Sequence, residues 1–187
     1  MPKRSAPIHY VCTLEEARKL IGKHDRFWVS NCGCREERGN RCKQGRMDVC
    51  LQFAAESAAS GSQKRQVPRQ DVEKLLKHAT DQFLVPRPFR DEASRSATEG
   101  ICFCCDDCCY YFKNPDGEPC DKGAFIEKTD MAACTVCGAC IDVCYFGART
   151  LERRELAVDR YRCHGCGVCR ASCPEECITM VKRAAGR

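Results

Sequence analysis

Apolar residues recur at the spacing of an α-helix in two stretches of the first half of the chain. The spacing predicts one helix over residues 13–24, which begins with a capping box formed by Thr13 and Glu16. It predicts a second, amphipathic helix over residues 72–83. The apolar positions are Leu14, Ala17, Leu20 and Ile21 in the first helix and Val72, Leu75, Leu76, Ala79 and Phe83 in the second.

Shorter patterns fill the rest of the first half. Residues 27–29 form an apolar run that is typical of a strand or a buried turn, and a further helix is predicted to begin near Asp48. Pro86, Pro88 and the polar residues up to Gly100 are expected to end the helical region. Residues 1–99 are therefore predicted to form a mainly α-helical domain.

Strand patterns appear in the last third of the chain. Residues 124–127, 156–158 and 178–181 are predicted strands, and short helices are predicted after Cys140 and Cys169. The expected fold class is therefore α+β. Its predicted parts are a helical, cysteine-rich domain over 1–99, a cysteine-rich connecting segment over 100–123 and a domain of short strands and helices over 124–187.

Cysteine dominates the composition, with 20 residues in a chain of 187. In a short secreted protein this content would suggest a disulfide scaffold. The first residues, however, lack the apolar stretch of a signal peptide, and basic residues interrupt every apolar run. The sequence therefore predicts a cytoplasmic protein without membrane insertion, whose reduced thiols can bind metal.

The formal net charge of +5, from 31 basic and 26 acidic residues, counts every cysteine as neutral. A [4Fe-4S]2+ core with four thiolates carries about −2, so two clusters would bring the protein near +1. The basic balance is thus weak evidence for nucleic-acid binding, and no nucleic-acid partner is expected.

Arg149, Arg153 and Arg154 form either a docking patch for an acidic partner or a solvated face. The sequence contains no glycine-rich phosphate-binding loop, so nucleotide binding is not expected.

Two copies of one cysteine pattern stand near the carboxyl end. The pattern is C-x2-C-x2-C-x3-C, and it occurs at Cys134, Cys137, Cys140 and Cys144 and again at Cys163, Cys166, Cys169 and Cys173. The first three thiols of such a loop bind one site, and the fourth points toward the other. Asp130, Gly138 and Thr150 also recur 29 positions later as Asp159, Gly167 and Thr179. This spacing indicates an internal repeat with pseudo-twofold symmetry.

Over residues 124–183 the chain resembles the bacterial dicluster ferredoxins. The resemblance implies two [4Fe-4S] clusters, one on Cys134, Cys137, Cys140 and Cys173 and the other on Cys163, Cys166, Cys169 and Cys144. The sequence departs from the family at Tyr145, where a proline usually follows the fourth cysteine of the first copy. Structural zinc usually pairs two separate C-x2-4-C knuckles, and disulfides would leave the closely spaced thiols competing for partners. Both alternatives therefore suit the pattern less well.

Four upstream cysteines form a second group: Cys32, Cys34, Cys42 and Cys50. Four thiolates around a polar loop make a complete ligand set, so a third [4Fe-4S] cluster is predicted, with structural zinc or free thiols as alternatives.

A third group has Cys102, Cys105 and Cys108 at C-x2-C-x2-C spacing. Its fourth ligand would be Cys104, Cys109, Cys120 or an upstream thiol. The alternatives are zinc, ligands shared with the second group, or an unusual catalytic cluster over Cys102–Cys109.

The whole chain also resembles a looser group of anaerobe proteins. In these a C-x-C-R…C…D-V-C-L-x-F region and a C-x-C-C segment precede a dicluster ferredoxin domain. The matching residues are Cys32, Cys34, Arg35, Cys42, Asp48, Val49, Cys50, Leu51, Phe53, Cys102, Cys104 and Cys105. The resemblance implies a redox protein with extra metal and names no substrate.

The sequence thus predicts an iron-sulfur electron-transfer protein, as a free polyferredoxin or as the relay subunit of a larger oxidoreductase, with no catalytic residues of its own. Its partner would be another redox protein. One alternative is a reductive enzyme with an iron-sulfur active site at Cys102–Cys109. Another is a metal-stabilised redox-sensing or assembly protein, whose upstream part would unfold on metal loss.

Overall fold

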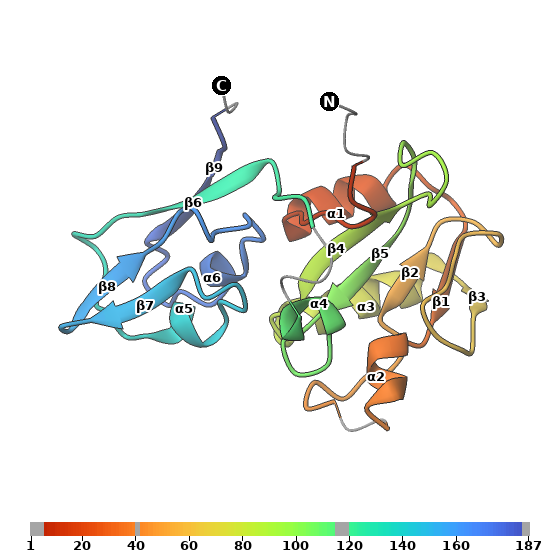
Figure 1. The fold of residues 1–187 in the computed structure, drawn as a ribbon, viewed down its shortest axis with the longest axis horizontal. Coiled ribbons are helices and arrows are strands. Elements are labelled where there is room, and N and C mark those ends of the chain that lie inside the picture. The colour runs from red at the N-terminus through yellow and green to blue at the C-terminus, as the bar shows by residue number, and fades with distance from the viewer. Residues whose placement is uncertain (1–5, 40–41, 115–119, 185–187) are drawn as a thin grey trace.

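The structure is a computed structural model that describes residues 6–39, 42–114 and 120–184. Its upstream part is built on one antiparallel sheet of five strands in the order β3-β1-β2-β5-β4 (Figure 1). The strands are β1 (Phe27–Ser30), β2 (Cys50–Gln52), β3 (Arg65–Val67), β4 (Val85–Arg90) and β5 (Thr98–Cys104). Four helices accompany them: α1 (Leu14–Ile21), α2 (Gly33–Glu37), α3 (Arg69–Asp81) and α4 (Tyr110–Lys113).

The predicted mainly α-helical, cysteine-rich region is wrong. Strands hold 26% of the described residues and helices 22%, and the five-stranded sheet organises the upstream half. The helix predicted near Asp48 is instead β2, all of whose residues are buried. A run of residues buried on both faces does not show the alternation that marks a half-exposed strand, so periodicity could not distinguish it from a helix.

Pro86 and Pro88, which the sequence predicts to end the helical region, lie inside β4, at the edge of the sheet. Proline lacks an N–H group, so it is tolerated at an edge. The N-terminal segment covers this edge, because Tyr10 donates its backbone N–H to the Pro88 carbonyl at 3.1 Å and Cys12 donates to Pro86 at 3.2 Å. The prolines therefore belong to the sheet and accept hydrogen bonds from the start of the chain.

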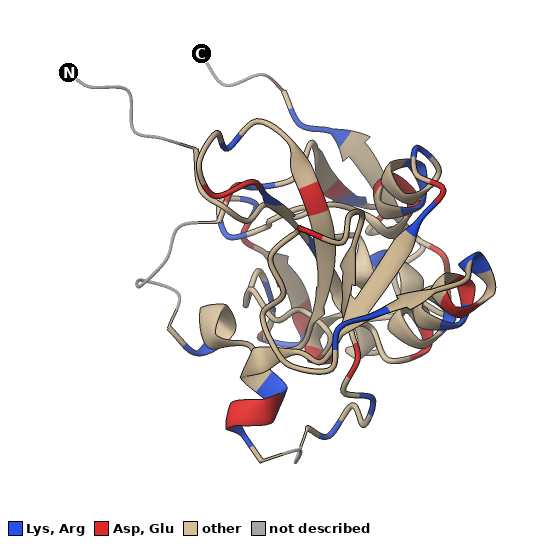
Figure 2. Ribbon diagram, turned by 90° about the vertical axis from the view of Figure 1, so that its right-hand side faces the viewer, with Lys and Arg blue, Asp and Glu red and all other residues tan. Residues whose placement is uncertain are grey.

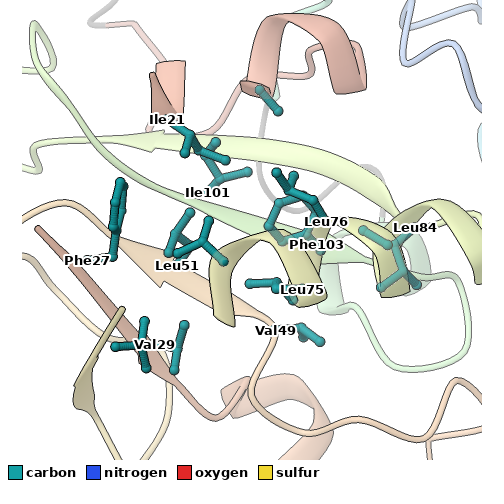
Figure 3. Packing of buried hydrophobic residues seen from close by; sticks show 14 of the residues in the cluster. Ile21, Phe27, Val29, Val49, Leu51, Leu75, Leu76, Leu84, Ile101 and Phe103 are labelled. Carbon is teal, nitrogen blue, oxygen red and sulfur yellow. The ribbon is translucent and has the colours of Figure 1, made fainter. Parts of the chain in front are cut away.

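The two amphipathic helices are present. The Thr13 side chain accepts from the Glu16 N–H and the Glu16 carboxylate accepts from the Thr13 N–H, so the predicted capping box forms at α1. The buried face of α3 enters the main core beside the apolar side chains of the sheet, among them Val29, Leu51 and Phe103 (Figure 3). The upstream part therefore has an extensive hydrophobic core of its own.

The C-terminal part consists of two copies of one short unit (Figure 1). The first copy is β6 (Phe125–Thr129), α5 (Ala139–Asp142) and β7 (Arg149–Glu152), and the second is β8 (Glu155–Val158), α6 (Val168–Ala171) and β9 (Ile178–Lys182). β6 pairs with β9 and β7 pairs with β8, both antiparallel. A rotation that exchanges the two copies therefore converts the β6–β9 pair into the β8–β7 pair, as expected for a twofold axis.

Backbone conformation repeats with the sequence. Val136, Gly138 and Gly147 have left-handed φ angles of 54°, 83° and 58°. The residues 29 positions later, Gly165, Gly167 and Glu176, have φ angles of 78°, 76° and 49°. Tight turns at the same places in both copies direct the flanking cysteines toward common points.

Basic and acidic residues are interspersed over the ribbon (Figure 2). Among the residues that the structure describes, no helix combines the length and the apolar character needed to cross a membrane.

Candidate metal centres

Three buried thiols from two distant segments meet in one compact group. The sulfurs of Cys42, Cys105 and Cys108 all lie within 4.8 Å of one another, and the Cys42 and Cys105 sulfurs are 3.6 Å apart. Zn–S bonds of about 2.3 Å in a tetrahedron place neighbouring sulfurs about 3.8 Å apart. We call this set the compact group, and its spacing suits a single ion.

Six further thiols form a row, which we call the thiol row. Cys50 lies opposite Cys102 in the β2–β5 register, with their sulfurs 3.2 Å apart. The neighbouring thiols of Cys34 and Cys50 raise the pKa of Cys32. The Cys109 and Cys32 thiols lower the pKa of Cys34, and the Cys104 thiol raises the pKa of Cys109. In order, the row is Cys102, Cys50, Cys32, Cys34, Cys109 and Cys104.

The structure thus groups the upstream cysteines differently from their order in the sequence. Cys42 lies with Cys105 and Cys108, whereas Cys50 lies beside Cys102, and Cys32 and Cys34 belong to the same row. The predicted sets, Cys32/Cys34/Cys42/Cys50 and Cys102/Cys105/Cys108, draw on both groups. The metal ligands themselves remain predictions. Sharing of cysteines between the two upstream groups is one of the alternatives left open by the sequence, but the particular grouping depends on the pairing of β2 with β5.

Each upstream group contains a buried arginine. The Arg35 side chain, in a residue only 1% exposed, donates to the Cys105 sulfur at 3.7 Å and to the Arg46 carbonyl. Arg87 is 4% exposed and donates to Cys109 at 3.2 Å and to Cys104 at 3.9 Å. Within the described ranges, neither arginine forms an ion pair with a carboxylate. A buried guanidinium needs an anion beside it, and the available anions here are thiolates.

Two small cavities lie in the C-terminal part. One is lined by Cys134, Cys137, Cys140 and Cys173, together with apolar residues such as Ile141 and Leu156. The other is lined by Cys144, Cys163, Cys166 and Cys169, together with apolar residues such as Val143 and Val158. Each cavity gathers the four cysteines that the ferredoxin resemblance assigns to one cluster. Four thiols gathered around one cavity are a donor set that fits an iron-sulfur cluster.

A buried ion pair stands between these cavities. Arg149 donates to the Glu127 carboxylate at 2.6 Å, and both side chains are at most 2% exposed. Arg149 also donates to the Cys140 sulfur at 3.3 Å and lines the second cavity. Burial opposes its charge, but the nearby Cys169, Cys140 and Glu127 anions raise the pKa of Arg149. Arg149 is therefore part of the interior, and not of an exposed docking patch.

Cys177 lies closer to the first cavity than its position in the repeat suggested. It aligns with Ala148 and reads in the sequence as a small core residue. Its sulfur is 3.5 Å from that of Cys173, and it lines the same cavity as the four predicted ligands. The cavity therefore holds a fifth thiol.

Aromatic side chains connect the upstream groups with the second cavity. Tyr145 packs against the core that contains Cys42, Cys105 and Cys108, and also against the cluster that contains Cys166. Burial, and then the charges of Asp106 and the neighbouring thiols, raise the pKa of Tyr145 to about 12. A bulky aromatic residue thus replaces the usual proline at the junction between the two parts of the chain.

A second aromatic contact starts at Arg87. Its guanidinium lies 4.2 Å from the centre of the Tyr111 ring, and the Tyr111 hydroxyl is 3.2 Å from His164 Nε2. His164 Nδ1 lies 2.9 Å from the Arg162 carbonyl, so Nδ1 carries the proton and Tyr111 donates to Nε2. Phe146 stacks on His164 at 4.1 Å. His164, which lies inside the second cysteine loop, is therefore packed against aromatic rings and only partly exposed.

No known protein family matches the chain. A stretch of 60 residues is 37% identical to the archaeal-type glutamate synthase (NADPH) of Thermotoga maritima and to that of Thermotoga sp. strain RQ2. The stretch covers 31% of this chain and only 12% of each relative. The likeness is therefore local. The 20 cysteines and the compact group indicate a cysteine-rich protein that can bind metal.

Proposed function

We propose that this protein is an iron-sulfur electron-transfer protein of the cytoplasm, with two [4Fe-4S] clusters in its ferredoxin-like C-terminal part. The observation that carries the proposal is the division of eight cysteines between two cavities, each lined by the four that the repeat assigns to one cluster. Bound there, a cluster would accept or release one electron with little rearrangement of the protein. The local likeness to glutamate synthases named for NADPH is in keeping with a redox role.

The protein's own contribution is to hold the sulfurs and set their surroundings. Left-handed turns at Gly138 and Gly167 shape the two loops. The Arg149 guanidinium donates to Cys140, which stabilises negative charge on that sulfur. Apolar side chains in both cavities limit the access of water. These features tune a redox centre through hydrogen bonds and burial.

The aromatic junction favours a relay over a simple two-cluster carrier. Tyr145 lies between the compact group and Cys166, and Tyr111, Phe146 and His164 lie between Arg87 and the second cavity. A redox-active upstream centre would thus be joined to the second cavity by packed side chains. We propose a relay subunit that docks on a redox partner, with a free polyferredoxin as the simpler form.

The test is to measure iron and acid-labile sulfide per chain after anaerobic purification, and to record electron paramagnetic resonance spectra after reduction. We expect at least about eight irons, from two four-iron clusters, and a signal from interacting reduced clusters. Cys137→Ser and Cys166→Ser should each alter one cluster, whereas Cys12→Ala, at a buried cysteine in neither cavity lining, should keep the full content. A colourless protein without sulfide would refute the proposal.

A further inference from the structure

The thiol row brings together four separate segments of the chain. Cys32 and Cys34 come from the start of α2, Cys50 from β2, Cys102 and Cys104 from β5, and Cys109 from the residue before α4. The Cys50 and Cys102 sulfurs are 3.2 Å apart at one end of the row, and the Arg87 guanidinium donates to both Cys104 and Cys109 at the other. The thiols in between shift the pKa values of their neighbours. Ser60 adds a hydroxyl 3.1 Å from the Cys50 sulfur.

The shape of the row differs from that of the compact group. Among the described residues, Cys42, Cys105 and Cys108 are the only set of three such ligands whose donor atoms all lie within 4.8 Å of one another. The row is therefore extended, with adjacent sulfurs close and further ones more widely separated. A single tetrahedral ion needs sulfurs about 3.8 Å apart in all directions. The row suits a centre with several metal atoms.

The buried charge of Arg87 also favours a metal centre at the thiol row. Its guanidinium is buried and donates to the Cys104 and Cys109 sulfurs, and Cys120 also lies beside it, while Nε has no hydrogen-bond partner among the described residues. The face of Tyr111 supplies only a partial negative charge. Burying this cation is costly unless an anion compensates it, and thiolates bound to metal would do so.

We propose that the thiol row binds a polynuclear iron-sulfur cluster, separate from the compact group, with Cys50 and Cys102 among its ligands and Arg87 as its buried counter-charge. This inference builds on the proposed function, because it assigns the chain a further redox centre. The centre lies on the Arg87 side of the Tyr111 and His164 contact, and so at one end of the aromatic junction.

The test compares two double variants of the full-length chain, purified anaerobically. Cys50→Ser/Cys102→Ser should lose about four irons and about four sulfides, while the metal of the compact group remains. Cys42→Ser/Cys108→Ser is the matched control, and it should lose about one metal ion and no sulfide. Unchanged sulfide in the first variant would overturn the proposal.

Two measurements do not depend on the folding of these variants. The unmodified chain should hold clearly more than about eight sulfides. A value near eight would overturn the thiol-row cluster and leave the proposed function intact. The absence of any sulfide would overturn both. Arg87→Gln, which keeps every cysteine, should lower the midpoint potential of the upstream cluster, because it removes a positive charge next to the sulfurs. Unchanged potentials throughout would contradict the role of Arg87.

Discussion

The ion pair between Arg149 and Glu127 exists in one half of the repeat only. The equivalent residues, 29 positions away, are Ile178 for Arg149 and Leu156 for Glu127, and both are buried. One half of the C-terminal part is thus apolar at a place where the other half contains a charge pair. This difference makes the two cavities electrostatically unequal despite their similar backbones.

Arg149→Ile should destabilise the protein by about 3–5 kcal/mol, because it leaves the buried Glu127 carboxylate without its main partner. Adding Glu127→Leu, which copies the other half of the repeat, should recover most of that loss. The free energy of unfolding, measured anaerobically by denaturant titration, checks both. Arg160→Gln is a control, since Arg160 is exposed and lies 3.4 Å from Glu127, and it should change stability by less than about 1 kcal/mol. A double variant as unstable as the single one would contradict this account.

Cys177 offers a second test at the residue scale. If it is a neighbour of the first cluster and not a ligand, Cys177→Ala should keep the full iron content, since Ala148 fills the equivalent place beside the second cavity. Cys173→Ala should lose or alter one cluster. Iron and sulfide determination distinguishes these results. Equal losses in the two variants would show that Cys177 also binds iron.

At the scale of the element, the two cluster loops differ at one turn. Val136 and Gly165 occupy equivalent left-handed positions, and this conformation is costly for a β-branched residue. Val136→Gly should therefore raise the free energy of unfolding by about 1 kcal/mol or leave it unchanged. Gly165→Val should be strongly destabilising, because a Cβ there would lie 2.0 Å from the Phe125 carbonyl oxygen. Thermal denaturation under anaerobic conditions compares them, and similar melting temperatures would contradict the prediction.

Tyr145 occupies the place of the second copy's Pro174. Tyr145→Pro would restore the ferredoxin pattern but remove the side chain that packs against both parts of the protein. We expect a loss of about 2 kcal/mol and slower electron transfer between the upstream centre and the C-terminal clusters. Tyr145→Phe keeps the ring and should resemble the unmodified protein. Rapid-mixing reduction kinetics, followed at the cluster absorption, would show the difference, and equal rates for all three proteins would exclude this role.

At the scale of the whole molecule, the two parts depend on metal to different degrees. The upstream core contains many buried apolar residues from the sheet, α1 and α3, whereas the main C-terminal core has few besides its cysteines, namely Leu156 and Ile178. Removing all metal anaerobically should therefore unfold the C-terminal part and leave the upstream sheet folded. Amide hydrogen exchange would show early loss of protection in β6–β9 and retained protection in β1, β2 and β5. The opposite order would favour a metal-stabilised upstream domain.

The sequence predicted local features well and long-range features poorly. The Thr13 cap, the α3 face and the 29-residue repeat depend on residues close in sequence or on direct comparison of two copies. The five-stranded sheet was missed because β2 is short and wholly buried, and because β4 contains two prolines. An upstream thiol beside Cys105 and Cys108 was among the alternatives left open by the sequence, but its identity as Cys42 depends on the long-range fold and could not be read from spacing alone.

Arg35 and Arg87 have a consequence for how the protein is made. Both guanidiniums are enclosed, and their nearest acidic groups are cysteines, which are neutral until something removes their protons. A newly synthesised chain that closed around them too early would trap two positive charges in an apolar interior. Biogenesis should therefore deliver the inorganic cofactors while these segments are still open, and a chain produced in cells starved of iron should fold its upstream sheet but keep the cysteine segments around the two arginines open to water.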